Sequence, residues 1–63
     1  MTPEAMALDV RRTVALWVTE GLTISQMCVA LRCKPPRPGA DALQYVVMRA
    51  TALWLNEMAQ EAA

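Results

Sequence analysis

The two cysteines are the side chains best suited to chemistry in this chain of 63 residues, which contains no histidine. A thiol becomes a strong nucleophile when a positive neighbour lowers its pKa, and Cys33 is flanked by Arg32 and Lys34. A zinc site needs about four Cys or His ligands, which Cys28 and Cys33 do not supply. On one helix, residues five apart would also point in different directions. We interpret both as reduced, half-buried apolar residues, with a redox switch or an intermolecular bridge as the alternatives.

Other catalytic machinery is missing from the sequence. The commonest general base is histidine, which is absent. None of the hydroxyl residues stands in a G-x-S-x-G turn, and two glycines are too few for a phosphate-binding loop of the Walker or Rossmann type. The six carboxylates are scattered. We therefore predict a protein that is not an enzyme and that uses no cofactor, metal or small-molecule substrate.

Apolar residues make up 56% of the chain and charged residues only 19%. A chain of this length buries only about 60% of the surface that it exposes when unfolded, and small domains usually gain stability from disulfides, a metal or oligomerisation. Because the sequence offers neither a disulfide framework nor a metal site, oligomerisation remains. We predict a single small helical domain over residues 1–63 that associates with a partner, with a homodimer as the first expectation.

The net charge is zero, which argues against bulk attraction to nucleic acid or to an anionic membrane. Half of the positive charge lies in residues 32–37, Arg-Cys-Lys-Pro-Pro-Arg. The N-terminal segment is acidic, unlike a signal peptide. The longest apolar run, Val14 to Val18, is far shorter than a membrane span. We expect a soluble cytoplasmic protein that does not bind membranes.

The spacing of apolar residues predicts an all-α fold of two or three helices, at about 3–20, 23–33 and 40–60. Thr2 and Pro3 are typical of a helix start, and Gly21 is typical of a helix end. Thr23 or Ser25 can cap the second helix. The alternative is one continuous helix over residues 3–33 with Gly21 inside it, at a cost of only about 1 kcal/mol.

Three prolines, at positions 35, 36 and 38, predict a stiff elbow before the last helix. That helix carries two apolar faces. The main face is predicted to comprise Leu43, Val47, Ala50, Trp54 and Met58, flanked by Val46 and Leu53. The second face comprises Met48, Ala52, Leu55 and Ala59. A helix that is apolar on two sides is normally buried on both. We therefore predict that the second face, together with Trp54, contacts a second copy of the chain in a homodimeric helical bundle.

Residues 16–34 resemble the first half of a helix-turn-helix domain. In that superfamily a helix often ends in an aromatic residue, a short polar pair and Gly-Leu-Ser/Thr. A short helix follows, with Gln, a buried aliphatic residue, a small residue and Leu. Here these places hold Trp17, Gly21, Leu22, Thr23, Gln26, Met27, Cys28 and Leu31, with Cys33 at the apolar place in the turn. The sequence departs from the pattern at Arg32, where the turn usually has Gly, and at the prolines that lengthen the connection.

The resemblance implies a DNA-binding transcription regulator whose recognition helix is the one at 40–60. The implied phosphate contacts are Arg32, Lys34 and Arg37 on the elbow, and Gln44 or Arg49 on the helix would reach base edges.

A second hypothesis is an inhibitor or adaptor of the kind carried by mobile elements, which docks an apolar helix face on a host regulatory protein. It is supported by the second face of the last helix and by the five methionines, which adapt to irregular partner surfaces.

Overall fold

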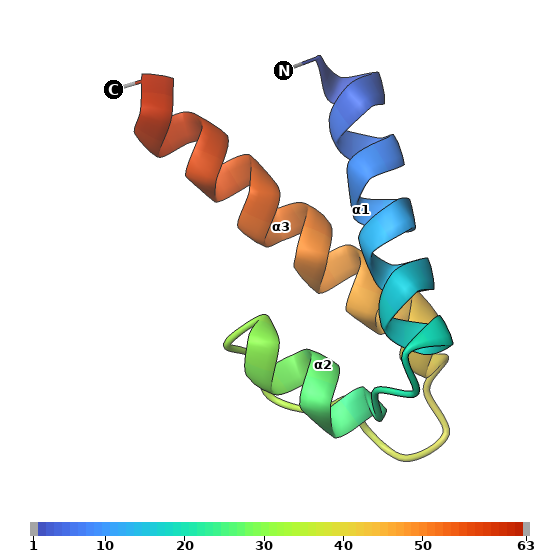
Figure 1. Ribbon diagram of the computed structural model, residues 1–63. Coiled ribbons are helices and arrows are strands. Elements are labelled where there is room, and N and C mark those ends of the chain that lie inside the picture. Colours follow the sequence, from blue (N-terminus) through green and yellow to red (C-terminus); the bar gives the residue numbers. More distant parts are fainter. Residues whose placement is uncertain (1, 63) are drawn as a thin grey trace.

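The computed structural model describes residues 2–62, and within these residues the only regular secondary structure is α-helix. Helix α1 spans Pro3–Thr19, α2 spans Ile24–Ala30 and α3 spans Ala42–Ala62. Helices α1 and α3 run antiparallel and diverge toward the two chain ends, while the short α2 crosses the opposite end of α3 (Figure 1). The all-α prediction with three helices is confirmed, and each predicted boundary lies within about three residues of the observed one.

Gly21 separates α1 from α2, which decides between the three-helix and two-helix alternatives. Its φ of 83° lies in the left-handed region that glycine adopts without steric cost. The amide of Gly21 donates to the carbonyl of Val18, and the amide of Leu22 donates to the carbonyl of Trp17. These two bonds form a Schellman motif, which satisfies the last carbonyls of α1.

Helix α2 begins with a capping box. The Thr23 hydroxyl accepts from the amide of Gln26 at 3.1 Å, and the Gln26 side chain accepts from the amide of Thr23 at 2.8 Å. Thr23, rather than Ser25, is therefore the N-cap. The two bonds satisfy amides that a helix start leaves without a partner.

Helix α2 ends in a second Schellman motif, about three residues earlier than predicted. Here the left-handed position is taken by Arg32, with φ of 57°. The amide of Arg32 donates to the carbonyl of Val29 at 3.1 Å, and the amide of Cys33 donates to the carbonyl of Cys28 at 3.0 Å. Left-handed φ costs a residue with a Cβ roughly 1–2 kcal/mol, so this turn is strained where the first one is not.

The connection from Leu31 to Asp41 leads to α3 without regular structure. Helix α3 starts where the carboxylate of Asp41 accepts from the amide of Gln44 at 3.1 Å. Asp41 therefore caps the helix and does not lie in its first turn, as the predicted start at residue 40 implied.

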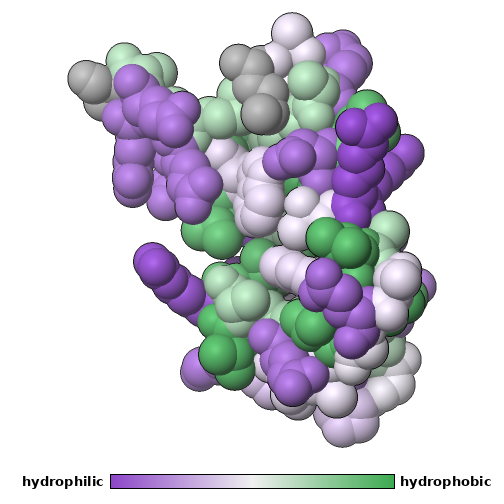
Figure 2. Space-filling view, viewed as in Figure 1, coloured by the Kyte–Doolittle hydropathy of each residue, from purple (hydrophilic) through white to green (hydrophobic). Residues whose placement is uncertain are grey.

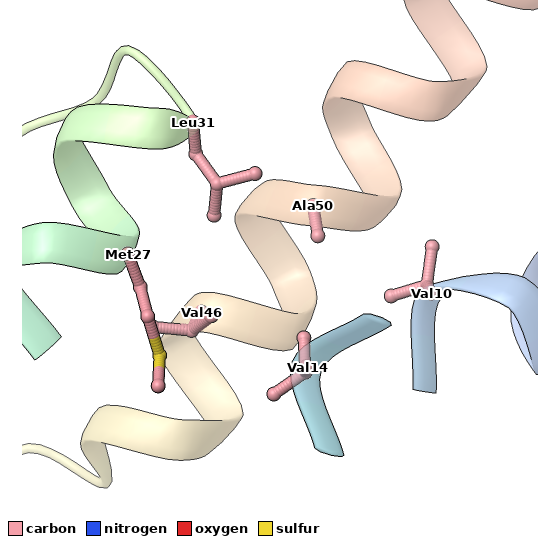
Figure 3. Packing of buried hydrophobic residues seen from close by; sticks show 6 residues of the cluster. All are labelled: Val10, Val14, Met27, Leu31, Val46 and Ala50. Atoms are coloured by element: carbon pink, nitrogen blue, oxygen red, sulfur yellow. The ribbon is translucent and has the colours of Figure 1, made fainter. Parts of the chain in front are cut away.

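The core lies where both α1 and α2 pack on α3. Figure 3 shows Val10 and Val14 of α1 and Met27 and Leu31 of α2 directed toward Val46 and Ala50 of α3. Val46 and Ala50 are both fully buried. Leu43 was predicted on the main apolar face but is 47% exposed. The core-facing line of α3 passes through Val46 instead, because Val46 and Ala50 are the positions on which residues of both α1 and α2 pack.

The molecule is extended for its size. Its radius of gyration is 12.0 Å, whereas a compact chain of this length has a radius of about 11 Å. Its accessible surface is 4768 Å², against about 4,000 Å² for a typical monomer of its mass. The chain thus exposes a surplus of surface, as its apolar composition predicted.

Candidate functional site: a basic cluster and an apolar face on α3

The phenol of Tyr45 joins Lys34, a predicted phosphate contact, to Arg49, which was predicted to reach base edges. Its hydroxyl donates to the backbone carbonyl of Lys34, so the connection after α2 is attached to α3. The same oxygen accepts from Nε of Arg49 at 3.2 Å, and the guanidinium carbon of Arg49 lies 5.5 Å from the centre of the Tyr45 ring. Lys34 and Arg49, which are fifteen positions apart in the sequence, are therefore both attached to Tyr45, Lys34 through its backbone and Arg49 through its side chain.

The electrostatic surroundings of Arg49 favour its positive charge. Its pKa is raised chiefly by the hydrogen bond to Tyr45, and further by its attraction to the phenol and to the thiols of Cys33 and Cys28. No carboxylate is among these causes. Only the Nε donor is engaged by Tyr45. The two terminal nitrogens of an arginine guanidinium are those that bind phosphate or base edges in DNA complexes.

Arg32 lies two positions before Lys34 on the same connection. Arg32, Lys34 and Arg49 are all exposed, and we refer to these three residues as the basic cluster. Of the five predicted DNA-binding residues, the structure thus joins Lys34 and Arg49 through Tyr45, and Arg32 is a near neighbour of Lys34 along the chain.

The other two predicted residues, Gln44 and Arg37, form no hydrogen bond with Tyr45 in residues 2–62. Gln44 is five positions before Arg49 on α3, which places it about 140° away around the helix axis. Its backbone amide donates to the carboxylate of Asp41. Arg37 belongs to the turn in which the amide of Ala40 donates to its carbonyl, and its side chain is exposed.

The second apolar face of α3, consisting of Met48, Ala52, Leu55 and Ala59, is exposed along its whole length. Met48 is 60% and Leu55 is 51% exposed. The face lies about 180° from the core-facing Val46 and Ala50. We refer to these four residues as the α3 face. Figure 2 shows, on the side seen there, apolar groups near the crossing of α2 and α3 and hydrophilic groups toward the free helix ends.

Trp54 does not share the α3 face with which it was grouped. It packs against the core cluster, and its indole Nε1 donates to Oδ2 of Asp9 at 2.7 Å. Trp54 therefore connects α3 with α1 within one chain.

The backbones of Cys28 and Cys33 meet at the end of α2, where the amide of Cys33 donates to the carbonyl of Cys28 at 3.0 Å, unlike those of two residues five apart on a continuous helix. The left-handed Arg32 ends the helix before Cys33 and turns the chain back over its last turn. Burial raises the pKa of the Cys28 thiol, and the hydrogen bond with the Cys33 thiol raises it further. Cys28 is buried and Cys33 is half-buried.

An open hollow of about 480 Å³ lies along the last turns of α3, lined by Trp54, Glu57, Met58, Glu61 and Ala62. All five residues belong to one helix, so the hollow has no facing set of polar groups that would orient a ligand. In residues 2–62 there is no group of three His, Cys, Asp or Glu side chains that could hold a metal ion. Within the same residues, no helix combines the length and apolar character required to cross a membrane.

Comparison of the chain with protein-family models, with curated proteins and with solved structures gives no match. Sequence reasoning missed Tyr45 and Asp9, whose roles depend on contacts between different helices. A signal for Tyr45 was present in its position four residues before Arg49, the spacing at which helical side chains meet.

Proposed function

We propose that this chain is a small non-enzymatic regulator that binds duplex DNA through the basic cluster as a homodimer formed through the α3 face. The observation that supports DNA binding is the Tyr45 hydroxyl, which binds both the backbone carbonyl of Lys34 and Nε of Arg49. Positioned Arg and Lys side chains contact phosphates and set the orientation of a protein on the duplex. A chain of zero net charge can bind DNA only if its positive charges are gathered in this way.

The surplus of accessible surface supports the homodimer. It amounts to roughly 800 Å², comparable with the area that each partner buries in a standard protein interface. The residues of the α3 face are spaced by four, three and four positions, the alternation that coiled-coil seams use. The positions on either side of the α3 face are occupied by Arg49, Thr51, Asn56 and Met58. No carboxylate there would repel its counterpart when two copies pair.

Two matched triple variants test DNA binding. Arg32, Lys34 and Arg49 are half of the six basic residues, and Arg11, Arg12 and Arg37 are the other half. Changing either set to alanine therefore gives the same net charge. We expect the cluster variant to lose affinity for a random-sequence duplex by about tenfold or more at low salt, and the control variant to lose much less.

The salt dependence gives a second readout. For the wild type, the logarithm of the binding constant should fall with the logarithm of salt concentration, with a slope of about −0.9 per phosphate neutralised. The cluster variant should lose most of that slope. An equal loss in both triple variants would mean that only bulk charge matters, and absence of wild-type binding at low salt would refute DNA binding.

Sedimentation at micromolar concentrations tests the homodimer separately. The variants Met48→Glu and Leu55→Glu place charge on the α3 face and should be monomeric. Val29→Glu is the matched control, because Val29 is 78% exposed and lies on α2, away from that face. A monomeric wild type would refute the homodimer without deciding whether DNA is bound.

The second candidate function is docking of the α3 face on another protein, and the same exposure of Met48 and Leu55 favours it. Interface cores are depleted in charged residues and enriched in Met and aromatic residues. A monomeric chain that does not bind DNA would leave this function as the better supported one. A host protein would then cover the face that we assign to a second copy.

A further inference from the structure

The paired thiols at the end of α2 carry an inference that does not depend on the proposed function. Cys28 lies at the third position from the end of α2, and Cys33 follows the left-handed residue. The 3.0 Å hydrogen bond from the amide of Cys33 to the carbonyl of Cys28 brings the two backbones together. In Schellman motifs the side chains at these two positions frequently contact each other.

We propose that Cys28 and Cys33 are a site of reversible oxidation, at which a hydroperoxide converts the two thiols into an intramolecular disulfide. Disulfides form between residues whose Cα atoms are about 4.4–6.8 Å apart and whose Cβ atoms face each other. The Schellman motif supplies this approach without any change in the fold of α2. Two cysteines five apart within a continuous helix would not meet these conditions.

The difference in exposure between the two thiols sets the order of the steps. Cys33 is half-buried and accessible to a small oxidant, whereas Cys28 is only 1% exposed. The Cys33 thiolate attacks one oxygen of the hydroperoxide, the O–O bond breaks, and a sulfenic acid forms on Cys33 with release of an alcohol or water. The Cys28 thiolate then attacks the Cys33 sulfur and displaces hydroxide, which leaves as water. Overall the two thiols lose two electrons and two protons to the peroxide.

Arg49 of α3 is close enough to this pair to act on the Cys28 thiol. Its positive charge acts on the Cys28 thiol in the direction that favours the thiolate, against the larger effect of burial. A buried resolving thiol beside a more exposed one favours formation of the disulfide over further oxidation of the sulfenic acid, because the second thiol is already in place.

The site is tested by treating the reduced protein with hydrogen peroxide and then alkylating it under denaturing conditions. We expect a monomeric chain two hydrogen atoms lighter that takes up no alkylating agent, and whose two thiols return after reduction with dithiothreitol. A peptide that contains both Cys28 and Cys33 should carry the bond, since Val29–Arg32 are the only residues between them.

Two variants separate the geometry from general thiol reactivity. The double change Cys33→Ser with Lys34→Cys moves the second thiol one residue along, out of the Schellman position, and should form the intramolecular disulfide at least about tenfold more slowly. In Cys28→Ser, Cys33 should proceed to higher oxides or to adducts with added thiols. Circular dichroism should show that both variants keep their helices.

Equal rates for the native and shifted pairs would overturn the proposal, because the bond would then not depend on the turn at Arg32. It would also be overturned if the wild-type product were a disulfide-linked dimer on a non-reducing gel, or a chain that gained oxygen atoms.

Discussion

The indole Nε1 of Trp54 donates a 2.7 Å hydrogen bond to Oδ2 of Asp9 and so joins α3 to α1 across forty-five positions of the sequence. Beyond this bond the two helices diverge toward their free ends (Figure 1). Within residues 2–62 this bond is the only side-chain hydrogen bond between α1 and α3. It also holds Trp54 on the inner side of α3, away from the α3 face.

This bond should contribute measurably to stability. We expect Trp54→Phe and Asp9→Ala each to lower the free energy of unfolding by about 1 kcal/mol, because each removes one partner of a charge-assisted hydrogen bond at an exposed site. Urea denaturation of both single variants and of the double variant checks this. Coupling close to zero in the double-mutant cycle would show that the two side chains act independently.

The core of α3 is centred on Val46 and Ala50, and this placement can be tested by comparing two truncations. Met27→Ala removes a side chain that is 1% exposed and packs on this core. We expect a loss of about 3 kcal/mol, a large share of the stability of so small a domain. Leu43→Ala, at a residue 47% exposed, should cost less than about 0.5 kcal/mol. Thermal unfolding distinguishes the two, and a larger effect at Leu43 would favour the face predicted from the sequence.

Arg32 and Gly21 occupy equivalent left-handed positions at the ends of α2 and α1, with φ of 57° and 83°. Arg32→Gly should therefore stabilise the protein by about 1 kcal/mol, because it removes the clash of a Cβ in this conformation. Gly21→Ala should destabilise it by a similar amount, although an added Cβ would meet no atom within 4 Å. The two effects have opposite signs, and chemical denaturation measures both. Loss of stability in Arg32→Gly would mean that the Arg32 side chain makes a stabilising contact of its own.

The Tyr45 hydroxyl can be removed with little change in packing. Tyr45→Phe keeps the ring under Arg49 but deletes the oxygen that binds Lys34 and Arg49. We expect a loss of about 1 kcal/mol in stability. If the proposed DNA binding is correct, affinity should fall while the salt dependence stays nearly constant, because no charge is removed. Fluorescence polarisation with a labelled duplex measures both. A reduced salt slope would indicate that Tyr45 itself contacts the DNA backbone.

The helix ends could be predicted from the sequence because their signals are local. Thr2, Thr23 and Gly21 act on amides and carbonyls within four residues, and the structure places each of them where such signals predict. The α3 face could also be predicted, because helical periodicity alone places Met48 and Leu55 on one side of the helix.

The relationships between elements could not be predicted in the same way. Which line of α3 faces the core depends on the angles at which α1 and α2 cross it, and both Val46 and Leu43 satisfy the local pattern. The Tyr45 contact with Lys34 depends on the path of a connection that has no regular structure. The approach of Cys33 to Cys28 depends on a left-handed φ at Arg32, a conformation that residue type argues against.

The buried thiol of Cys28 predicts a specific dependence of stability on pH. Its pKa is raised in the folded protein, first by burial and then by the Cys33 thiol. In the unfolded chain the thiol ionises near its ordinary value of about 8.5, while in the folded chain it remains protonated to higher pH. The folded state therefore binds more protons in this range, and stability must fall as pH rises. The contribution of Cys28 is complete below the ordinary thiol pKa and is lost as pH rises through the folded value. We expect urea denaturation of the reduced protein between neutral pH and pH of about 10 to show this decline. Cys28→Ala should have lower stability but a smaller decline. An unchanged decline in that variant would assign the pH dependence to other groups.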